Sequence, residues 1–195
     1  MNQKAQWTAE IVVNAPLKTV WEVANDVTLI PRYHPEVDTV DVIAGQARRT
    51  VGTKYQCNIL DGRRAGHCVE EVLAYEPERM VVTRMVSDTW GIDRMLADFR
   101  VKSTASPRSK RSTILRFEAF YKPVGLKNRL LNAWFLRRAL RKRSLAVMNG
   151  IKRMAEGKID GATDGTPQAE TTSGTRARKA PSLSKVDPTA SLEPR

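Results

Sequence analysis

The sequence predicts an α+β fold: a curved, seven-stranded antiparallel sheet, two short helices, and one long C-terminal helix that encloses a cavity against the sheet. Two observations predict it. Strand-like stretches separated by short turns occupy residues 37–121, and connections this short join neighbouring antiparallel strands. One helical stretch follows at 126–156; at roughly 1.5 Å per residue it spans about 45 Å. It is the only segment long enough to cover such a sheet.

The first elements are a strand and two short helices. Residues 7–14 alternate as a half-buried strand does, with one face made by Trp7, Ala9, Ile11 and Val13. Asn14 can cap the following helix, and Pro16 suits its first turn. Asp26 offers a second cap before a stretch whose two prolines permit only short helical pieces.

Six further strands are predicted near 37–44, 52–60, 64–75, 79–87, 92–103 and 112–121. Turn signals separate them, among them Asp61-Gly62, Glu76-Pro77-Glu78 and the basic loop 106–112. The last strand alternates most clearly. We expect its inward face to consist of Leu115, Phe117, Ala119 and Tyr121.

The long helix is amphipathic and is expected to end at Gly157, in the C-terminal cap position. A straight helical projection gives a stripe formed by Leu126, Leu130, Ala133, Leu136, Leu140, Val147, Met148, Ile151, Met154 and Ala155. Leu131, Trp134, Phe135 and Leu145 fall outside this stripe. The first half of the helix is therefore apolar over a wide arc, and we expect the excess to contact something other than water.

Composition divides the chain into one domain, 1–156, and a tail, 157–195, that we expect to be disordered. The tail has few large apolar side chains among Gly, Ser, Thr, Pro and Ala, too few to offset the entropy of ordering it. No apolar run approaches 18 residues and no signal-like segment is visible, so a cytoplasmic protein with reduced thiols is expected. Neither cysteine has metal-ligand spacing, and no metal or cofactor is predicted.

Several motifs give a family resemblance. They are the stretches NAPLKTVWEVANDVTLIPRYHPEV at 14–37 and GTKYQC at 52–57, an acidic-Pro-x-Arg turn at 76–79, and the Leu- and Arg-rich final helix. With this order of elements, residues 5–156 resemble the START-like superfamily, also called SRPBCC proteins, and its polyketide cyclase/dehydrase branch in particular. The resemblance implies a helix-grip fold with a pocket. It leaves function open, because the superfamily includes cyclases, lipid and quinone carriers, and other binding proteins.

The apolar residues expected around the cavity are Tyr33, Tyr55, Trp90, Met95, Phe99, Phe117, Tyr121, Leu130 and Trp134. The alternative is that they fill a solid core. His34 is a candidate general acid or base, or a structural residue of a His-Pro step. His67 lies on a strand, and its face depends on the register of the hairpin at 61–64. Cys57 and Cys68 are interpreted as small core residues.

Three functions remain open at this point. The first is binding, as a carrier or by sequestration, of a hydrophobic small molecule such as a polyketide, lipid or quinone. The second is a cyclase or dehydratase that uses a pocket histidine. The third is peripheral membrane association through the basic helix, because ten basic residues and no acid lie between Lys122 and Arg153. Its anion contacts would be Lys127, Arg138, Arg141 and Lys142. Nucleic acid is disfavoured for want of a binding motif, and the oligomeric state is open.

Overall fold

The structure is a computed structural model and describes residues 3–61 and 64–157. Along the described chain the elements are β1 (Trp7–Val13), α1 (Leu17–Asn25), the 3-10 helix η1 (Val27–Leu29), α2 (Ile30–Tyr33), β2 (Val37–Ala44), β3 (Lys54–Asp61), β4 (Arg64–Glu76), β5 (Met80–Asp88), α3 (Ile92–Met95), β6 (Leu96–Ser109), β7 (Ser112–Pro123), α4 (Gly125–Leu131), the π-helix η2 (Asn132–Leu136) and α5 (Arg137–Ala155). Apart from Gly157, the predicted tail lies outside the described residues.

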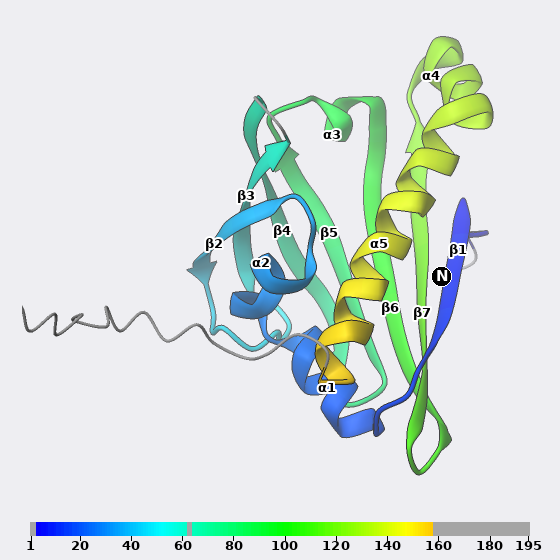
Figure 1. The fold of residues 1–195 in the computed structure, drawn as a ribbon. Coiled ribbons are helices and arrows are strands. Elements are labelled where there is room, and N and C mark those ends of the chain that lie inside the picture. The colour runs from blue at the N-terminus through cyan, green and yellow to red at the C-terminus, as the bar shows by residue number, and fades with distance from the viewer. Residues whose placement is uncertain (1–2, 62–63, 158–195) are drawn as a thin grey trace, which may run out of the picture. The chain divides into compact units, whose positions relative to one another are not determined.

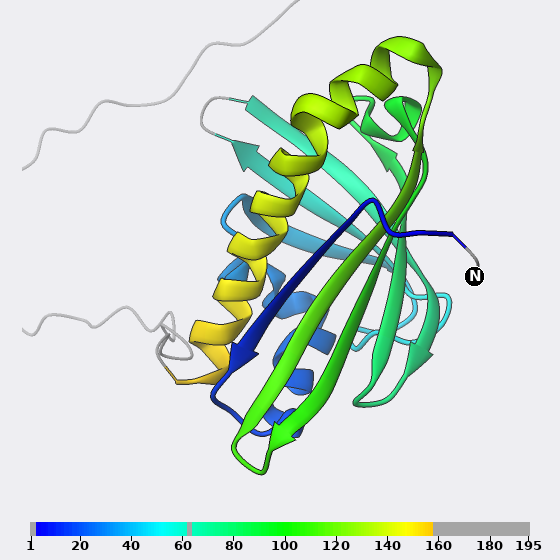
Figure 2. The same cartoon turned by 90° about the vertical axis from the view of Figure 1, so that its right-hand side faces the viewer.

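Within the described residues, seven strands form one antiparallel sheet in the order β1-β7-β6-β5-β4-β3-β2. The sheet curves around α5, which crosses its concave side, while α1 and α2 lie beside the C-terminal half of that helix (Figures 1 and 2). Apart from β1, which pairs with β7, every strand pairs with its neighbour in sequence, as the short turns predicted. The predicted fold class is confirmed.

Alternation explains which faces of β1 and β7 are buried. On β7 the side chains of Leu115, Phe117, Ala119 and Tyr121 are buried, and on β1 those of Trp7, Ala9 and Val13. These inward faces meet buried residues of α1 and of the second half of α5 in one core. A sheet with one packed and one solvated face requires this period of two.

The caps of the first helices were only partly predicted. Asp26 caps η1, since its carboxylate accepts a hydrogen bond from the backbone N–H of Thr28 at 2.9 Å. Asn14 does not cap α1. Its backbone N–H donates to Glu156 Oε1 at 2.7 Å, and Pro16 occupies the N-cap position with no side-chain cap. Asn14 thus joins the end of β1 to the end of α5.

The predicted strand 92–103 was wrong at its start. Residues 92–95 form the single turn α3, because the Asp88 carboxylate accepts hydrogen bonds from the backbone N–H groups of Trp90, Ile92 and Asp93 at 2.7–3.0 Å. The predicted loop 106–112 was too long, since β6 stays paired with β7 as far as Ser109 and Ser112.

The predicted C-terminal helix is continuous from α4 through η2 to α5, and Gly157 ends it with a positive φ of 70°. Its middle was not predicted. Residues 132–136 form a π turn, which inserts one extra residue and so rotates the side chains of α4 about the helix axis relative to those of α5. Consequently Met148 and Ile151 face the core, as expected, whereas Leu126 and Leu130 are exposed.

Candidate ligand cavity

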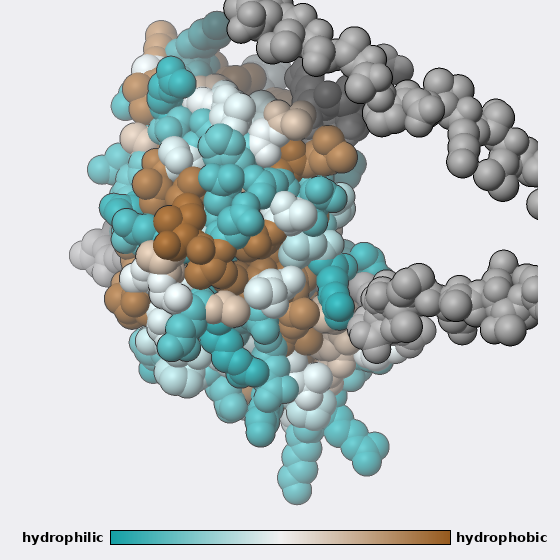
Figure 3. Space-filling view, turned by 90° about the vertical axis from the view of Figure 1, so that its left-hand side faces the viewer, coloured by the Kyte–Doolittle hydropathy of each residue, from teal (hydrophilic) through white to brown (hydrophobic). Residues whose placement is uncertain are grey.

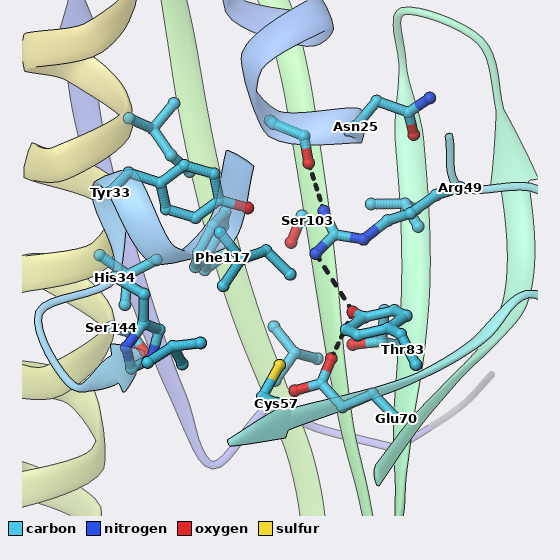
Figure 4. A pocket seen from close by; sticks show the side chains of 18 of the residues that line it. Asn25, Tyr33, His34, Arg49, Cys57, Glu70, Thr83, Ser103, Phe117 and Ser144 are labelled. Atoms are coloured by element: carbon cyan, nitrogen blue, oxygen red, sulfur yellow. Dashed lines mark hydrogen bonds between the residues drawn. The ribbon is translucent and has the colours of Figure 1, made fainter. Parts of the chain in front are cut away.

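A cavity of about 160 Å³ lies between the sheet, the α1–α2 region and the second half of α5 (Figure 4). Its wall includes residues of α5, namely Ser144, Val147 and Ile151, and residues of the N-terminal helices, namely Trp21, Ala24, Asn25, Ile30 and Tyr33. The strands contribute mostly apolar side chains, among them Val81, Val101, Leu115 and Phe117. The long helix therefore covers a hollow in the sheet and not a solid core.

A chain of three polar side chains interrupts the apolar wall on one side of the cavity. Arg49, which precedes β3, donates to the hydroxyl of Tyr55 at 3.1 Å, and this hydroxyl donates to Glu70 Oε2 at 2.6 Å (Figure 4). The guanidinium also donates to the backbone carbonyl of Ala24 at the end of α1. Arg49 thereby ties the first helix to two neighbouring strands.

The surroundings fix the charge states of this cluster. Burial disfavours the charged form of Arg49, but the oxygens of Tyr55, Tyr33 and Glu70 outweigh it and raise the pKa of Arg49 above its usual range. Burial raises the pKa of Tyr33 and that of Tyr55, in spite of the nearby guanidinium. At neutral pH Arg49 is therefore a cation, and Tyr33 and Tyr55 are neutral phenols.

Two polar atoms at this end of the cavity are buried without a hydrogen-bond partner. They are Nε of Arg49 and Oδ1 of Asn25. Arg49 as a whole keeps some exposure, but its Nε does not. A buried, unpaired N–H on a cation costs free energy.

His34 follows α2 and lies on the cavity wall beside Ser144 of α5 (Figure 4). Its Nδ1 accepts a hydrogen bond from the backbone N–H of Glu36 at 3.2 Å. Burial, helped by the nearby charge of Arg143, lowers the pKa of His34 to about 4. The imidazole is thus neutral at pH 7, and the nitrogen that would take a proton is already occupied.

The other candidate reactive groups are inert or outside the cavity. Cys57 and Cys68 face each other across β3 and β4, and both are buried and free. A hydrogen bond with Cys57, together with burial, raises the pKa of the Cys68 thiol far above neutrality, so it is no thiolate nucleophile. His67 is exposed on the opposite face of β4, where it contacts Thr89.

Of the residues predicted to surround the cavity, the structure brings together Tyr33, Tyr55 and Phe117, with His34 beside them. Tyr121 is buried but bonds to Asn132 at 2.8 Å, away from the cavity wall, and Phe99 stacks on it with 5.3 Å between ring centroids. Met95 packs against the core beyond the cavity wall. None of these three residues belongs to the lining of the cavity.

Three placements are corrected. Trp90 is partly exposed and lies over Gly66, where even a Cβ would come within 2.4 Å of its ring. Leu130 and Trp134, expected over the cavity, have exposed fractions of 57% and 80%. The straight-helix projection misplaced Leu130, because it ignored the π turn and ran past the end of the packed core, whereas Trp134 lay outside its apolar stripe.

Four residues of the cavity wall were not predicted from the sequence: Arg49, Glu70, Trp21 and Asn25. Arg49 sits in a polar connection that is typical of a protein surface. Glu70 could have been predicted from the sequence. It lies two residues from Cys68 and two from Val72 on the same strand, and both are buried, so its side chain points to the same inward face. An inward acid on a central strand requires partners, and the structure supplies Tyr55.

Solved structures with the same architecture define the class to which this fold belongs. Major latex-like protein 151 from Panax ginseng is 12% identical, covering 76% of this chain and 95% of its own, with a TM-score of 0.63. Norcoclaurine synthase from Thalictrum flavum, in complex with dopamine and hydroxybenzaldehyde, is 16% identical over 76% and 84%, with a TM-score of 0.59. The Zhui aromatase/cyclase from Streptomyces sp. R1128 is 16% identical over 78% and 94%, with a TM-score of 0.56. The chain is therefore a helix-grip protein.

The family can be stated more closely than the fold class. The model of the family described as polyketide cyclase / dehydrase and lipid transport matches residues 4–156, nearly the whole described part. This chain belongs to that family, whose members bind hydrophobic ligands or act as cyclases. Among curated proteins none matches the chain.

Proposed function

We propose that the protein binds a small hydrophobic molecule in the cavity, with an oxygen atom of that molecule placed against Arg49. The observation that carries the proposal is an apolar hollow under α5 with the guanidinium of Arg49, bonded to Tyr55, in its wall. Apolar pockets with a few convergent polar groups are the usual form of small-molecule sites. The polar group then fixes the orientation of the ligand and discriminates between ligands.

The size of the hollow limits what fits inside. A volume of about 160 Å³ is close to that of an engineered apolar cavity of about 150 Å³ that binds benzene. One substituted ring therefore fits without rearrangement. A polyketide, quinone or lipid would place one ring or chain end here and leave the remainder outside the hollow. Among these, the carbonyl-bearing polyketides and quinones match Arg49 best.

A cyclase or dehydratase remains the alternative, and family membership is its main support. Its predicted general base, His34, is poorly suited to that role. A group with a pKa of about 4 holds a proton only weakly at pH 7, and Nδ1 already accepts from Glu36. Binding without His34-dependent catalysis is therefore the better-supported function.

Acetophenone and α-methylstyrene test the proposed site, because the two molecules have nearly the same shape and only the first carries a carbonyl oxygen. We expect wild type to bind both in NMR titrations. Arg49→Met should weaken the binding of acetophenone at least tenfold, since a hydrogen bond to a charged group contributes roughly 1.5–3 kcal/mol, and should leave the binding of α-methylstyrene unchanged. The control is Arg48→Met, which changes the exposed neighbour. Equal affinity of Arg49→Met and wild type for acetophenone would refute the assigned anchor.

A further inference from the structure

The segment from Val124 to Phe135, comprising α4 and the start of η2, has its polarity inverted relative to a normal surface helix. Its exposed side chains include six large apolar ones: Val124, Leu126, Leu130, Leu131, Trp134 and Phe135. Only two residues of this segment are not exposed, and both are asparagines, Asn128 and Asn132. An amphipathic surface helix packs the apolar side inward and the polar side outward.

Specific hydrogen bonds hold this inverted orientation. Asn132 is buried and accepts from the Tyr121 hydroxyl at 2.8 Å, while its amide reaches Gln6 Oε1 at 3.4 Å. Asn128 donates to the carbonyl of Val124 at 2.8 Å. The π turn begins at Asn132, so the two bonds that join Asn132 to Tyr121 and Gln6 fix which way Trp134 and Phe135 project. Exposure of the apolar side chains is thus built into the fold.

The charge around this apolar surface has a single sign. Exposed cations stand among and directly after the apolar residues: Lys127, Arg129, Arg137, Arg138, Arg141 and Lys142. No acidic residue occurs between Lys122 and Ala155. The face bearing β2 and β3 also mixes apolar and hydrophilic side chains (Figure 3), but its exposed charges include the acids Asp38 and Asp41 of β2.

The apolar side chains and the cations together indicate which kind of partner binds this surface. A second copy of the chain would bring two cationic surfaces together, which is repulsive. Nucleic acid would meet the cations but leave six large apolar side chains unused. A bilayer with anionic lipids satisfies both, because Trp, Phe and Leu enter the interface while Lys and Arg meet the headgroups. Trp134, 80% exposed, is an aromatic side chain of the kind enriched at that depth.

We propose that Val124–Phe135 and its flanking cations dock this protein on an anionic lipid surface, with Trp134 and Phe135 inserted in the headgroup region. No helix among the described residues is long and apolar enough to span a bilayer. The contact is therefore peripheral. It goes beyond the proposed ligand binding and does not depend on it, since none of these residues lines the cavity.

Co-sedimentation with vesicles tests the proposal on the full chain. With vesicles of 70% phosphatidylcholine and 30% phosphatidylglycerol at 0.1 M NaCl, wild type should pellet. Binding should fall at least tenfold with pure phosphatidylcholine, and also in 0.5 M NaCl, because salt screens the cations. Trp134 is the most exposed of the four tryptophans, so brominated lipid should quench its emission, and Trp134→Phe should remove that quenching.

Matched variants separate docking from general charge. Trp134→Glu with Phe135→Glu should lower binding at least tenfold, whereas Ile43→Glu with Val51→Glu, also exposed and equal in charge change, should not. Lys127→Gln with Arg129→Gln should weaken binding more than Lys110→Gln with Arg111→Gln in the hairpin between β6 and β7. The proposal is overturned if wild type does not bind the vesicles, or if the Trp134/Phe135 variant binds as well as wild type. It is also overturned if light scattering shows that wild type is a dimer and that the Trp134/Phe135 variant is not.

Discussion

At the scale of single residues, the cavity is distinguished from an ordinary apolar core by a few polar side chains in its wall. Arg49 connects α1, β3 and β4 through the Ala24 carbonyl, Tyr55 and Glu70, and its Nε–H has no hydrogen-bond partner. Sequence patterns found the tyrosines, because large aromatic residues on inward positions are expected in a core. The same patterns do not predict Arg49, since no local pattern shows that a cationic side chain in a loop will bond to the end of a neighbouring helix.

His34 gives a prediction for stability against pH. Its folded pKa of about 4 lies below the ordinary value, so the unfolded chain takes up a proton before the folded chain does. Stability contributed by neutral His34 is full above pH 6.5 and is lost as the pH falls towards 4, by about 3 kcal/mol at most. Urea unfolding at several pH values measures it.

The control for that experiment is the other histidine. His34→Gln should flatten the dependence between pH 6.5 and 4, while His67→Gln, on the exposed side of β4, should keep it. A dependence that persists unchanged in His34→Gln would show that other groups cause it.

At the scale of elements, the strands and hairpins could be predicted and the details of the helices could not. Period-two alternation on β1 and β7 follows from one packed and one solvated face, so it survives in the sequence. The π turn at 132–136 leaves no such mark, and the hydrogen bond that accompanies it, from Tyr121 to Asn132, joins two different elements. The turn α3 likewise depends on the Asp88 carboxylate, which caps it from the end of β5.

The crossing of α5 with α2 depends on a single glycine. A Cβ added at Gly150 would lie 2.0 Å from the backbone carbonyl oxygen of Tyr33, so the two helices touch through their backbones. Near this crossing, an ion pair between Arg143 and Glu36 joins the same two regions. The position of α2, and with it the side chains of Tyr33 and His34, is therefore set by the absence of a side chain.

Gly150→Ala should destabilise the protein by about 1–3 kcal/mol, since overpacking outweighs the better helix propensity of alanine. The comparison is Asn149→Ala, one residue earlier on the exposed side, which should change the free energy of unfolding by less than about 0.5 kcal/mol. Denaturant titration measures both. A stable Gly150→Ala variant would mean that α2 is free to move away from α5.

At the scale of the whole molecule, the same long helix serves two regions of different chemistry. Its C-terminal half covers the cavity through Ser144, Val147 and Ile151. The segment before it turns apolar side chains outward among cations. The excess of apolar residues in this segment and a membrane contact through the basic helix were predicted from the sequence, but Leu130 and Trp134 were predicted to surround the cavity. A protein arranged in this way could take up a hydrophobic molecule at a lipid surface and hold it under the helix.

The central claim is that the hollow under α5 receives a hydrophobic molecule, and filling the hollow tests it directly. Ser144 lines the cavity and Asn149 is exposed on the same helix, so Ser144→Phe and Asn149→Phe add the same ring inside and outside. The measurement is the affinity for α-methylstyrene. We expect saturable binding by wild type and Asn149→Phe, with at least a tenfold loss in Ser144→Phe. Equal binding by Ser144→Phe, or none by wild type, would contradict the account.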